Sequence, residues 1–355
     1  MIEISVNAGA APYSIRIGRG VLDAPDWLKP LAPAGCLALT DANVWRHQGP
    51  RLLAASGLSA DEVLVLTPGE PAKALATVAR IWDWMAARRL SRDGVLVAFG
   101  GGVIGDLAGF AAATWMRGID FVQVPTTLLA MVDSAVGGKT GINLAAGKNL
   151  VGAFHQPRAV LADLANLDTL PRRELAAGLA EVVKYGAIRD AEFFTWLEAH
   201  AEALCALDPA ALGEAIRVSL GHKAQIVERD PLERGERALL NFGHSFGHAL
   251  EVEGNYVALL HGEAVAIGML LAARLSARLG MADAADTARL ATLLKRLGLA
   301  TVTPASMQPE RLLARMRLDK KNTREGLRLI LWRGIGRAEI VSGVDPAQIL
   351  AILGE

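Results

Sequence analysis

The chain has 355 residues, of which 52% are hydrophobic and 21% charged, so it can bury a large core and is not expected to be disordered. Its 37 basic and 37 acidic side chains cancel, which argues against a nucleic-acid-binding protein or one held electrostatically at a membrane. Only nine of the basic residues are lysines, and the others are arginines. Because the pKa of lysine can shift whereas arginine stays charged, the few positions that keep lysine are candidates for a functional site.

The sequence also limits where the protein is found. Charged residues such as Asp133 and Glu181 interrupt its apolar stretches, so no membrane-spanning helix is expected. The first six residues alternate like a strand and lack the basic region and apolar run of a secretory signal. Cys36 and Cys205 are too few and too far apart for a disulfide framework or a cysteine zinc site. We therefore expect a cytoplasmic protein.

Strand and helix patterns alternate in the first half of the chain. Helical patterns cover segments such as residues 71–89 and 103–116. Runs of β-branched residues predict strands at residues 2–6, 13–17, 36–40, 63–66, 95–99 and 121–124. This alternation is typical of an α/β layer with a mostly parallel sheet.

After about Asp168 the pattern becomes helical. A short hairpin is predicted around residues 333–336. Helices are predicted at residues 171–188, 191–206, 209–227, 244–253, 261–279, 284–297 and 309–317. We therefore predict the α/β class, with a Rossmann-like domain at residues 1–168, a mainly α-helical domain at residues 169–355, and the active site in the cleft between them.

A glycine-rich turn follows the strand predicted at residues 95–99. Gly100, Gly102 and Gly105 match the spacing G-x-G-x-x-G between a strand and a helix. Their missing Cβ atoms would let a pyrophosphate approach backbone amides at the N-terminus of the helix. A tight turn that only packs the helix against the sheet is the competing interpretation.

Two further loops also follow predicted strands. One contains Glu70 and Lys73, and the other contains Thr126 and Thr127. Ligands of open α/β sheets bind at the carboxyl ends of strands, so these loops and the glycine turn together favour a phosphate or dinucleotide site.

Residues 133–149 hold two lysines and two asparagines among glycines and other small residues. The run from Gly138 to Thr140 matches the end of a P-loop, but Asp133 stands where that motif needs its first glycine. A nucleotide-triphosphatase is therefore excluded, and an anion-binding loop built from lysine charge, amide donors and backbone N–H groups remains. A solvated surface loop is the alternative, but such a loop in this chain would be expected to carry arginine.

The helical half contains a possible metal site. Glu181 and Lys184 share one helix face among apolar residues, where a buried glutamate needs a cation. His244 and His248 are four residues apart, and His261 opens an apolar helix. Mixed histidine and carboxylate ligands suit zinc, cobalt or a similar divalent ion and leave positions open for a substrate. Spacing does not decide which two histidines bind, and Lys184 alone could be the partner of Glu181.

Seven motifs, in the same order along the chain, carry a resemblance to a known family. They lie at residues 100–106, 125–127, 133–143, 147–149, 180–186, 241–248 and 261–263. Together they resemble the 3-dehydroquinate synthases of the sugar phosphate cyclase superfamily, over about residues 65 to 325. The resemblance implies a carbon–oxygen lyase of the shikimate pathway that converts 3-deoxy-D-arabino-heptulosonate 7-phosphate into 3-dehydroquinate and phosphate. It also implies bound NAD and a divalent metal, zinc or cobalt.

The resemblance further implies roles for individual residues. The metal ligands would be Glu181, His244 and His261, and His248 would transfer a proton. NAD would contact Glu70, Lys73, Gly102, Val103, Ile104, Gly105, Asp106, Thr126, Thr127, Lys139, Lys148 and Thr169. The substrate would be surrounded by Arg117, Asp133, Lys139, Asn149, Lys184, Lys223, Arg237, Asn241 and Lys320, with Lys321 as the alternative to Lys320. The resemblance also implies a homodimer, in which Arg117 is expected to reach the phosphate from the neighbouring subunit.

The implied reaction starts with transient oxidation of a substrate hydroxyl by NAD, with the metal as Lewis acid. Phosphate elimination, return of the hydride and an intramolecular aldol closure follow. The main alternative is an NAD- and metal-dependent polyol dehydrogenase of the glycerol-dehydrogenase type, which would not need so many phosphate- and carboxylate-binding groups. Lys223 and Arg237 argue against a third possibility, a cyclase whose substrate lacks a carboxylate. A non-enzymatic NAD- or metal-sensing module is the fourth.

Overall fold

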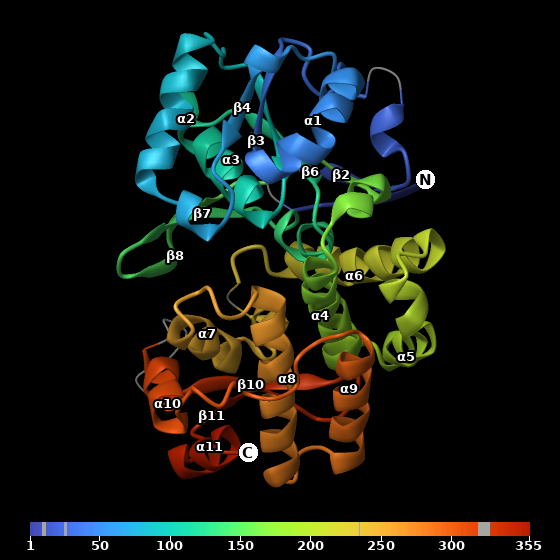
Figure 1. Cartoon of the computed structure of the whole chain (residues 1–355), viewed down its shortest axis with the longest axis vertical. Helices are drawn as coiled ribbons and strands as arrows, with labels where there is room; N and C mark the ends of the chain where they lie inside the picture. The colour runs from blue at the N-terminus through green and yellow to red at the C-terminus, as the bar shows by residue number, and fades with distance from the viewer. Residues whose placement is uncertain (9–11, 25–26, 234, 319–326) are drawn as a thin grey trace. The chain divides into compact units, whose positions relative to one another are not determined.

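The computed structural model describes residues 1–8, 12–24, 27–233, 235–318 and 327–355. The chain forms two compact units (Figure 1). The first consists of Met1–Leu170 and Leu212–Leu232, and the second of Pro171–Ala211 and Glu233–Glu355. The domain boundary predicted between residues 168 and 169 stays a prediction, and residues 212–232 join the first unit.

Within the described residues, seven strands of the first unit form one sheet with the order β1-β2-β9-β6-β5-β3-β4. β1 and β2 pair antiparallel, and every other neighbouring pair is parallel. The strands are β1 (Ile2–Val6), β2 (Tyr13–Gly18), β3 (Cys36–Asp41), β4 (Val63–Leu66), β5 (Val95–Gly100), β6 (Asp120–Pro125) and β9 (Ala159–Asp163). The predicted α/β class and mostly parallel sheet are confirmed, and β9 is an additional strand.

Helices cover both faces of this sheet. They are α1 (Ala42–Ser56), α2 (Leu75–Ala87) and α3 (Gly102–Thr114). Leu96 and Ala98 of β5 pack with α2 and α3, whereas Val97 and Phe99 point to the opposite face and pack with Leu52 of α1. This alternation buries β5 completely. Polar groups that bind a ligand are therefore confined to the loops at the strand ends.

Residues 139–154 form a β-hairpin and not the irregular loop that the glycine content predicts. β7 (Lys139–Leu144) and β8 (Gly147–Phe154) pair antiparallel and project from the first unit as a separate two-stranded sheet (Figure 1). A Cβ atom at Gly152 would lie 2.1 Å from the carbonyl oxygen of Thr140. Glycine here permits a close approach of two strands, which a sequence pattern does not distinguish from a flexible turn.

The helices that follow are α4 (Arg172–Arg189), α5 (Ala191–Cys205), α6 (Pro209–Arg229), α7 (His244–Glu253), α8 (His261–Arg278), α9 (Ala284–Arg296), α10 (Pro309–Arg317) and α11 (Pro346–Leu353). β10 (Arg328–Trp332) and β11 (Ala338–Ser342) form the predicted hairpin. α4 to α10 confirm the predicted helices to within two residues. α8 packs against α4, α7 and α9 in the second unit. No helix within the described ranges has an apolar stretch long enough to span a bilayer.

Candidate active site

Three potential metal ligands converge in the second unit. Glu181 lies on α4, His244 opens α7 and His261 opens α8. One ligand atom of each residue lies within 4.8 Å of the other two. The Nε2 atoms of His244 and His261 each lie 3.7 Å from Oε1 of Glu181. Three residues that are up to 80 positions apart in the sequence therefore face one point.

The surroundings of Glu181 show whether a cation would be favourable between these three residues. Its side chain is fully buried, and its Oε1 atom makes no hydrogen bond within the described residues. The other oxygen, Oε2, accepts a hydrogen bond from the buried ammonium of Lys184. A buried carboxylate oxygen without a partner is costly. Lys184 thus neutralises one side of Glu181, while Oε1 and the two imidazole nitrogens form a donor set suited to a divalent ion.

His248 lies next to this donor set. Its ring centroid is 5.5 Å from that of His244 and 6.2 Å from that of His261. Among the described residues, the group whose ligand atoms meet consists of Glu181, His244 and His261, without His248. The spacing leaves open which two of the three histidines bind a metal, and the geometry favours His244 and His261.

Glycines allow the three ligand-bearing helices to approach closely. A Cβ atom at Gly262 would lie 1.9 Å from the carbonyl oxygen of Ala177 on α4. A Cβ atom at Gly268 would lie 2.1 Å from the carbonyl oxygen of Gly243, which itself precedes α7 with a φ of +79°. Side chains at these positions would separate the helices and move the histidines away from Glu181.

An ion pair between α4 and α8 holds the first turn of α8 in place. Arg173 donates two hydrogen bonds to Glu263, from Nε at 2.6 Å and from Nη2 at 2.7 Å. Glu263 also accepts a hydrogen bond from the backbone N–H of Leu260, 2.8 Å away. Burial alone would raise the pKa of Glu263, but these hydrogen bonds outweigh it and lower the pKa. The pair fixes the helix end that carries His261, and the sequence gives no signal for Arg173.

The glycine turn in the first unit is tightly packed. A Cβ atom at Gly100 would lie 2.7 Å from Cβ of Ile104, and one at Gly105 would lie 2.8 Å from Oε1 of Gln123. These contacts indicate that glycine is needed at these positions because the helix packs closely against the sheet. They are also compatible with an anion site, because α3 begins at Gly102 and the backbone N–H groups of its first turn, including that of Val103, have no acceptor within the helix.

The loop after β6 lies beside this turn. The backbone N–H of Thr126 donates to the carbonyl oxygen of Gly100 at 3.0 Å. A Cβ atom at Gly101 would lie 3.1 Å from the methyl carbon of Thr127. The loops after β5 and β6 are therefore neighbours, as expected for the carboxyl ends of parallel strands.

Lys73 is the centre of a polar network in the first unit. Its side chain is only 4% exposed, although it carries an ammonium group. Nζ donates to Oδ2 of Asp106 at 2.6 Å and to Oδ1 of Asn149 at 2.5 Å, and it lies 3.7 Å from Oε1 of Glu70. The loop after β4 thus contacts the start of α3 and the β7–β8 hairpin.

Asn143 extends this network, although no sequence pattern predicts it as a contact residue. Its Nδ2 donates to Oε1 of Glu70 at 2.8 Å, and its Oδ1 accepts from the backbone N–H of Asn149 at 2.9 Å. Nζ of Lys148 lies 4.0 Å from the same oxygen of Glu70. Five predicted residues, Glu70, Lys73, Asp106, Lys148 and Asn149, therefore gather in one place.

Lys223 belongs to the part of α6 that joins the first unit. Its side chain is 4% exposed, and Nζ donates to Oδ1 of Asp133 at 2.6 Å and also to the backbone carbonyl of Asp133. Asp133 lies in a π-helical turn, Ala130–Ser134. These two predicted residues are 90 positions apart, so only the fold brings them together.

Three other predicted residues, Arg117, Lys139 and Thr169, lie in the first unit. Arg117 is exposed at the end of the 3-10 helix Trp115–Arg117, which follows α3, and its φ is 69°. Lys139 is exposed at the start of β7. Thr169 accepts a hydrogen bond from Gln48 at 2.9 Å. Lys320, like Lys321, lies outside the described residues.

Two predicted residues of the second unit lie on a 3-10 helix, Glu236–Asn241. Arg237 is 2% exposed. Nδ2 of Asn241 donates to Oε1 of Glu233 at 3.0 Å, a contact that no sequence pattern predicts.

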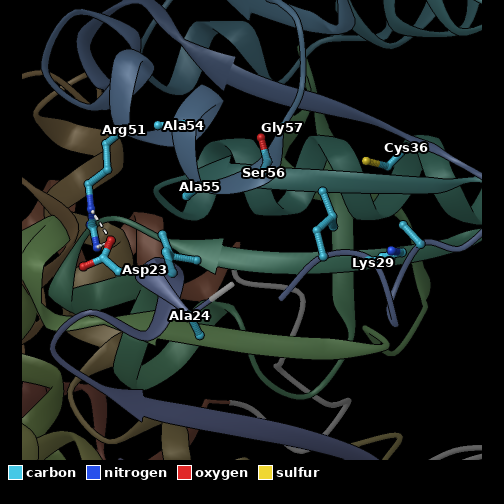
Figure 2. A pocket seen from close by; sticks show the side chains of 12 residues that line it. Asp23, Ala24, Lys29, Cys36, Arg51, Ala54, Ala55, Ser56 and Gly57 are labelled. Atoms are coloured by element: carbon cyan, nitrogen blue, oxygen red, sulfur yellow. Dashed lines mark hydrogen bonds and ion pairs between the residues drawn. The ribbon is translucent and has the colours of Figure 1, made fainter. Parts of the chain in front are cut away.

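A pocket of about 570 Å³ lies beside α1 in the first unit (Figure 2). Lys29 and Cys36 line it, together with Arg51, which is bound to Asp23 at 3.1 Å and to Asp163 at 2.5 Å. Burial raises the pKa of the Cys36 thiol to about 11, which keeps it protonated and unreactive. None of the predicted site residues lines this pocket, so it is not part of the candidate active site.

The structure combines an α/β fold with two groups of polar residues. One surrounds the glycine turn after β5, as in phosphate-binding enzymes, and the other is a cluster of one glutamate and two histidines suited to a metal ion. Residues 63–177 match the family described as 3-dehydroquinate synthase N-terminal, and residues 178–322 match 3-dehydroquinate synthase C-terminal. The chain belongs to the 3-dehydroquinate synthase family.

Individual relatives agree with this assignment. The chain is 56% identical to the 3-dehydroquinate synthase of Xanthomonas campestris pv. campestris (strain 8004) over 357 residues, which cover 98% of this chain and 96% of the relative. A solved structure of 2-epi-5-epi-valiolone synthase from Streptomyces hygroscopicus subsp. jinggangensis 5008, with NAD+ and Zn2+ bound, superposes with a TM-score of 0.89 at 31% identity, covering 99% of this chain and 98% of that one. A 2-deoxy-scyllo-inosose synthase complexed with carbaglucose-6-phosphate, NAD+ and Co2+ gives a TM-score of 0.90 at 26% identity, with 99% of both chains covered.

Proposed function

We propose that this chain catalyses the reaction of its family, the conversion of 3-deoxy-D-arabino-heptulosonate 7-phosphate into 3-dehydroquinate and phosphate. The observation that carries the proposal is the buried Oε1 atom of Glu181, which has no hydrogen-bond partner within the described residues and faces Nε2 of His244 and of His261. The family match and the 56% identical relative support the lyase over the polyol dehydrogenase.

The residues of the chain fit both groups that the reaction needs. Glu181, His244 and His261 would hold Zn2+ or Co2+, and the glycine turn with Glu70, Lys73, Asp106 and the neighbouring residues would hold NAD. When bound, the metal ion supplies a Lewis acid, and NAD takes up a hydride and returns it. Two solved relatives with NAD+ and Zn2+ or Co2+ support this choice of groups.

The other predicted residues would bind and orient the substrate. Lys139 is exposed and Lys148 is partly exposed, so an anionic phosphate can reach both ammonium groups from solvent. Asp133 is held by Lys223, which fixes the direction of its carboxylate. Arg237 and Asn241 would also contact the substrate. His248, beside the metal-type cluster, would move a proton during the reaction.

The proposed assembly is a homodimer in which Arg117 completes the site of the neighbouring subunit. Arg117 is exposed and makes no ion pair with any described residue. It and Met116 both have positive φ values, 69° and 48°, which is a strained conformation for residues with side chains and is often kept for function. Leu150 and Phe154 of β8 are 45% and 51% exposed, so the hairpin offers an apolar surface that a second copy could cover.

Mixing two inactive variants tests this role of Arg117. We expect Arg117→Ala and His261→Ala each to be inactive as homodimers. A mixed dimer would contain one intact site, formed by His261 of one subunit and Arg117 of the other, so random reassociation should restore about a quarter of the normal activity. No recovery after demonstrated subunit exchange would place Arg117 in the site of its own subunit.

The proposed location is the cytoplasm. Cys36 and Cys205 are both free, which fits a reducing compartment.

The reaction itself is tested by its stoichiometry. Incubation of the purified protein with the heptulosonate phosphate, NAD and Zn2+ or Co2+ should give phosphate and 3-dehydroquinate in a one-to-one ratio. NADH should not accumulate, because the hydride returns to the product. Steady formation of NADH from a polyol, without phosphate release, would favour the dehydrogenase instead.

A further inference from the structure

Two glutamates whose side chains are hardly exposed lie close together on α7, and each contacts a basic side chain on another helix. Glu251 is 4% exposed, and the side chain of Glu253 is 6% exposed. Glu253 pairs with Arg311 at 2.7 Å and with Arg315 at 3.5 Å, and so ties α7 to α10. Oε2 of Glu251 instead lies 3.2 Å from Nδ1 of His261. One carboxylate therefore connects helices, and the other contacts a candidate metal ligand.

The contact with Glu251 determines how His261 can act. An ionised carboxylate only accepts hydrogen bonds, so Nδ1 of His261 must carry the proton. In the neutral imidazole the lone pair then lies on Nε2, the atom that is 3.7 Å from Oε1 of Glu181. The hydrogen bond also fixes the ring plane. His261 is thereby oriented with its free nitrogen toward the cluster.

The two histidines of the cluster have different groups near their Nδ1 atoms. Nδ1 of His244 lies 3.2 Å from the carbonyl oxygen of Phe242, a neutral acceptor. His261 is supported by a carboxylate, whose negative charge increases the electron density that the imidazole offers to a metal. The charge of Glu251 therefore strengthens one particular ligand of the three.

We propose that Glu251 is a positioning residue that orients His261 and strengthens its bond to the divalent metal. This inference rests on the proposed function, because it needs a metal ion at Glu181, His244 and His261. It assigns a role to a residue that no motif in the sequence singles out. Partners of this type at metal sites typically change metal affinity by about 10- to 100-fold when they are replaced.

The test compares Glu251→Gln with Glu251→Ala and with the matched control Glu253→Gln. Glutamine keeps the size of the side chain and an amide oxygen that can accept from Nδ1, so it removes mainly the charge. Alanine removes the charge and the hydrogen bond. We expect Zn2+ affinity, measured by competition with a chromophoric chelator, to fall about tenfold in Glu251→Gln and up to about 100-fold in Glu251→Ala. Glu253→Gln should bind Zn2+ like the unmodified protein.

The visible absorption of bound Co2+ supplies a second readout, which reports ligand geometry and not stability. Its bands should shift in both Glu251 variants and stay unchanged in Glu253→Gln. Far-UV circular dichroism and Tm should show that Glu251→Gln and Glu253→Gln are folded to the same extent. Unchanged Zn2+ affinity and Co2+ bands in Glu251→Gln would overturn the inference. Failure of the unmodified protein to bind either metal would contradict the proposed function itself, and the role of Glu251 with it.

Discussion

Replacing His261 with alanine is expected to abolish both metal binding and turnover. The change removes one of two imidazoles that face Oε1 of Glu181, and a buried carboxylate with one remaining histidine is a poor site for Zn2+ or Co2+. Loss of several kcal/mol of charge stabilisation corresponds to a turnover reduced by about 10³-fold or more. Metal content after dialysis and phosphate release measure the two effects separately.

His248→Ala is the matched control for this prediction. The ring centroids of His248 and His261 are 6.2 Å apart. His248 nevertheless does not belong to the group of potential metal ligands, Glu181, His244 and His261. This variant should therefore keep about one metal ion per chain while losing turnover, because the proposed proton transfer is removed. Normal metal content in His261→Ala, or loss of metal in His248→Ala alone, would show that the ligand assignment is wrong.

Replacing Gly262 with alanine is expected to disrupt the same site without touching a ligand. Alanine is the better helix former by about 1 kcal/mol, so propensity alone predicts a small gain in stability. The new Cβ would lie 1.9 Å from the carbonyl oxygen of Ala177, and backbone atoms on both sides cannot move aside easily. Overpacking of this kind costs about 1–3 kcal/mol or more, so the clash outweighs the propensity.

Gly221→Ala is the control, because its expected effect on stability is neutral or favourable. Gly221 is also helical, on α6, but nothing lies within 4 Å of the position its Cβ would take. Chemical denaturation should show lower stability for Gly262→Ala and unchanged or slightly higher stability for Gly221→Ala. Zn2+ affinity should fall only in Gly262→Ala, since α8 must move away from α4. Equal stability and equal Zn2+ affinity in the two variants would refute the role of close helix packing.

The sequence predicts helix positions in this protein better than it predicts side-chain partners. α7 and α10 begin and end where the apolar periodicity and the preceding residues indicate. The β7–β8 hairpin is missed because its glycines allow strands to approach, whereas glycine in a sequence indicates turns. Patterns of local spacing identify elements well, but they do not identify the contact that a glycine permits.

The lysines illustrate what remains hidden in the sequence. Their scarcity draws attention to Lys73, Lys184 and Lys223, but it does not predict their environment. Each of these ammonium groups is buried and bound to a carboxylate, of Asp106, Glu181 and Asp133 respectively. The partners of Lys73 and Lys223 are 33 and 90 positions away in the chain, so no spacing rule could pair them. The contacts of Arg173 with Glu263 and of Glu251 with His261 are missed for the same reason.

Phosphate release by metal-depleted protein tests most directly whether the reaction depends on a metal ion. Chelator-treated protein is supplied with the heptulosonate phosphate and NAD, and Zn2+ or Co2+ is added stepwise. We expect no phosphate before metal is added, full activity near one metal ion per chain, and no activity at any metal concentration when NAD is omitted. Phosphate release that persists after complete removal of the metal would show that the reaction does not depend on an ion held by Glu181, His244 and His261.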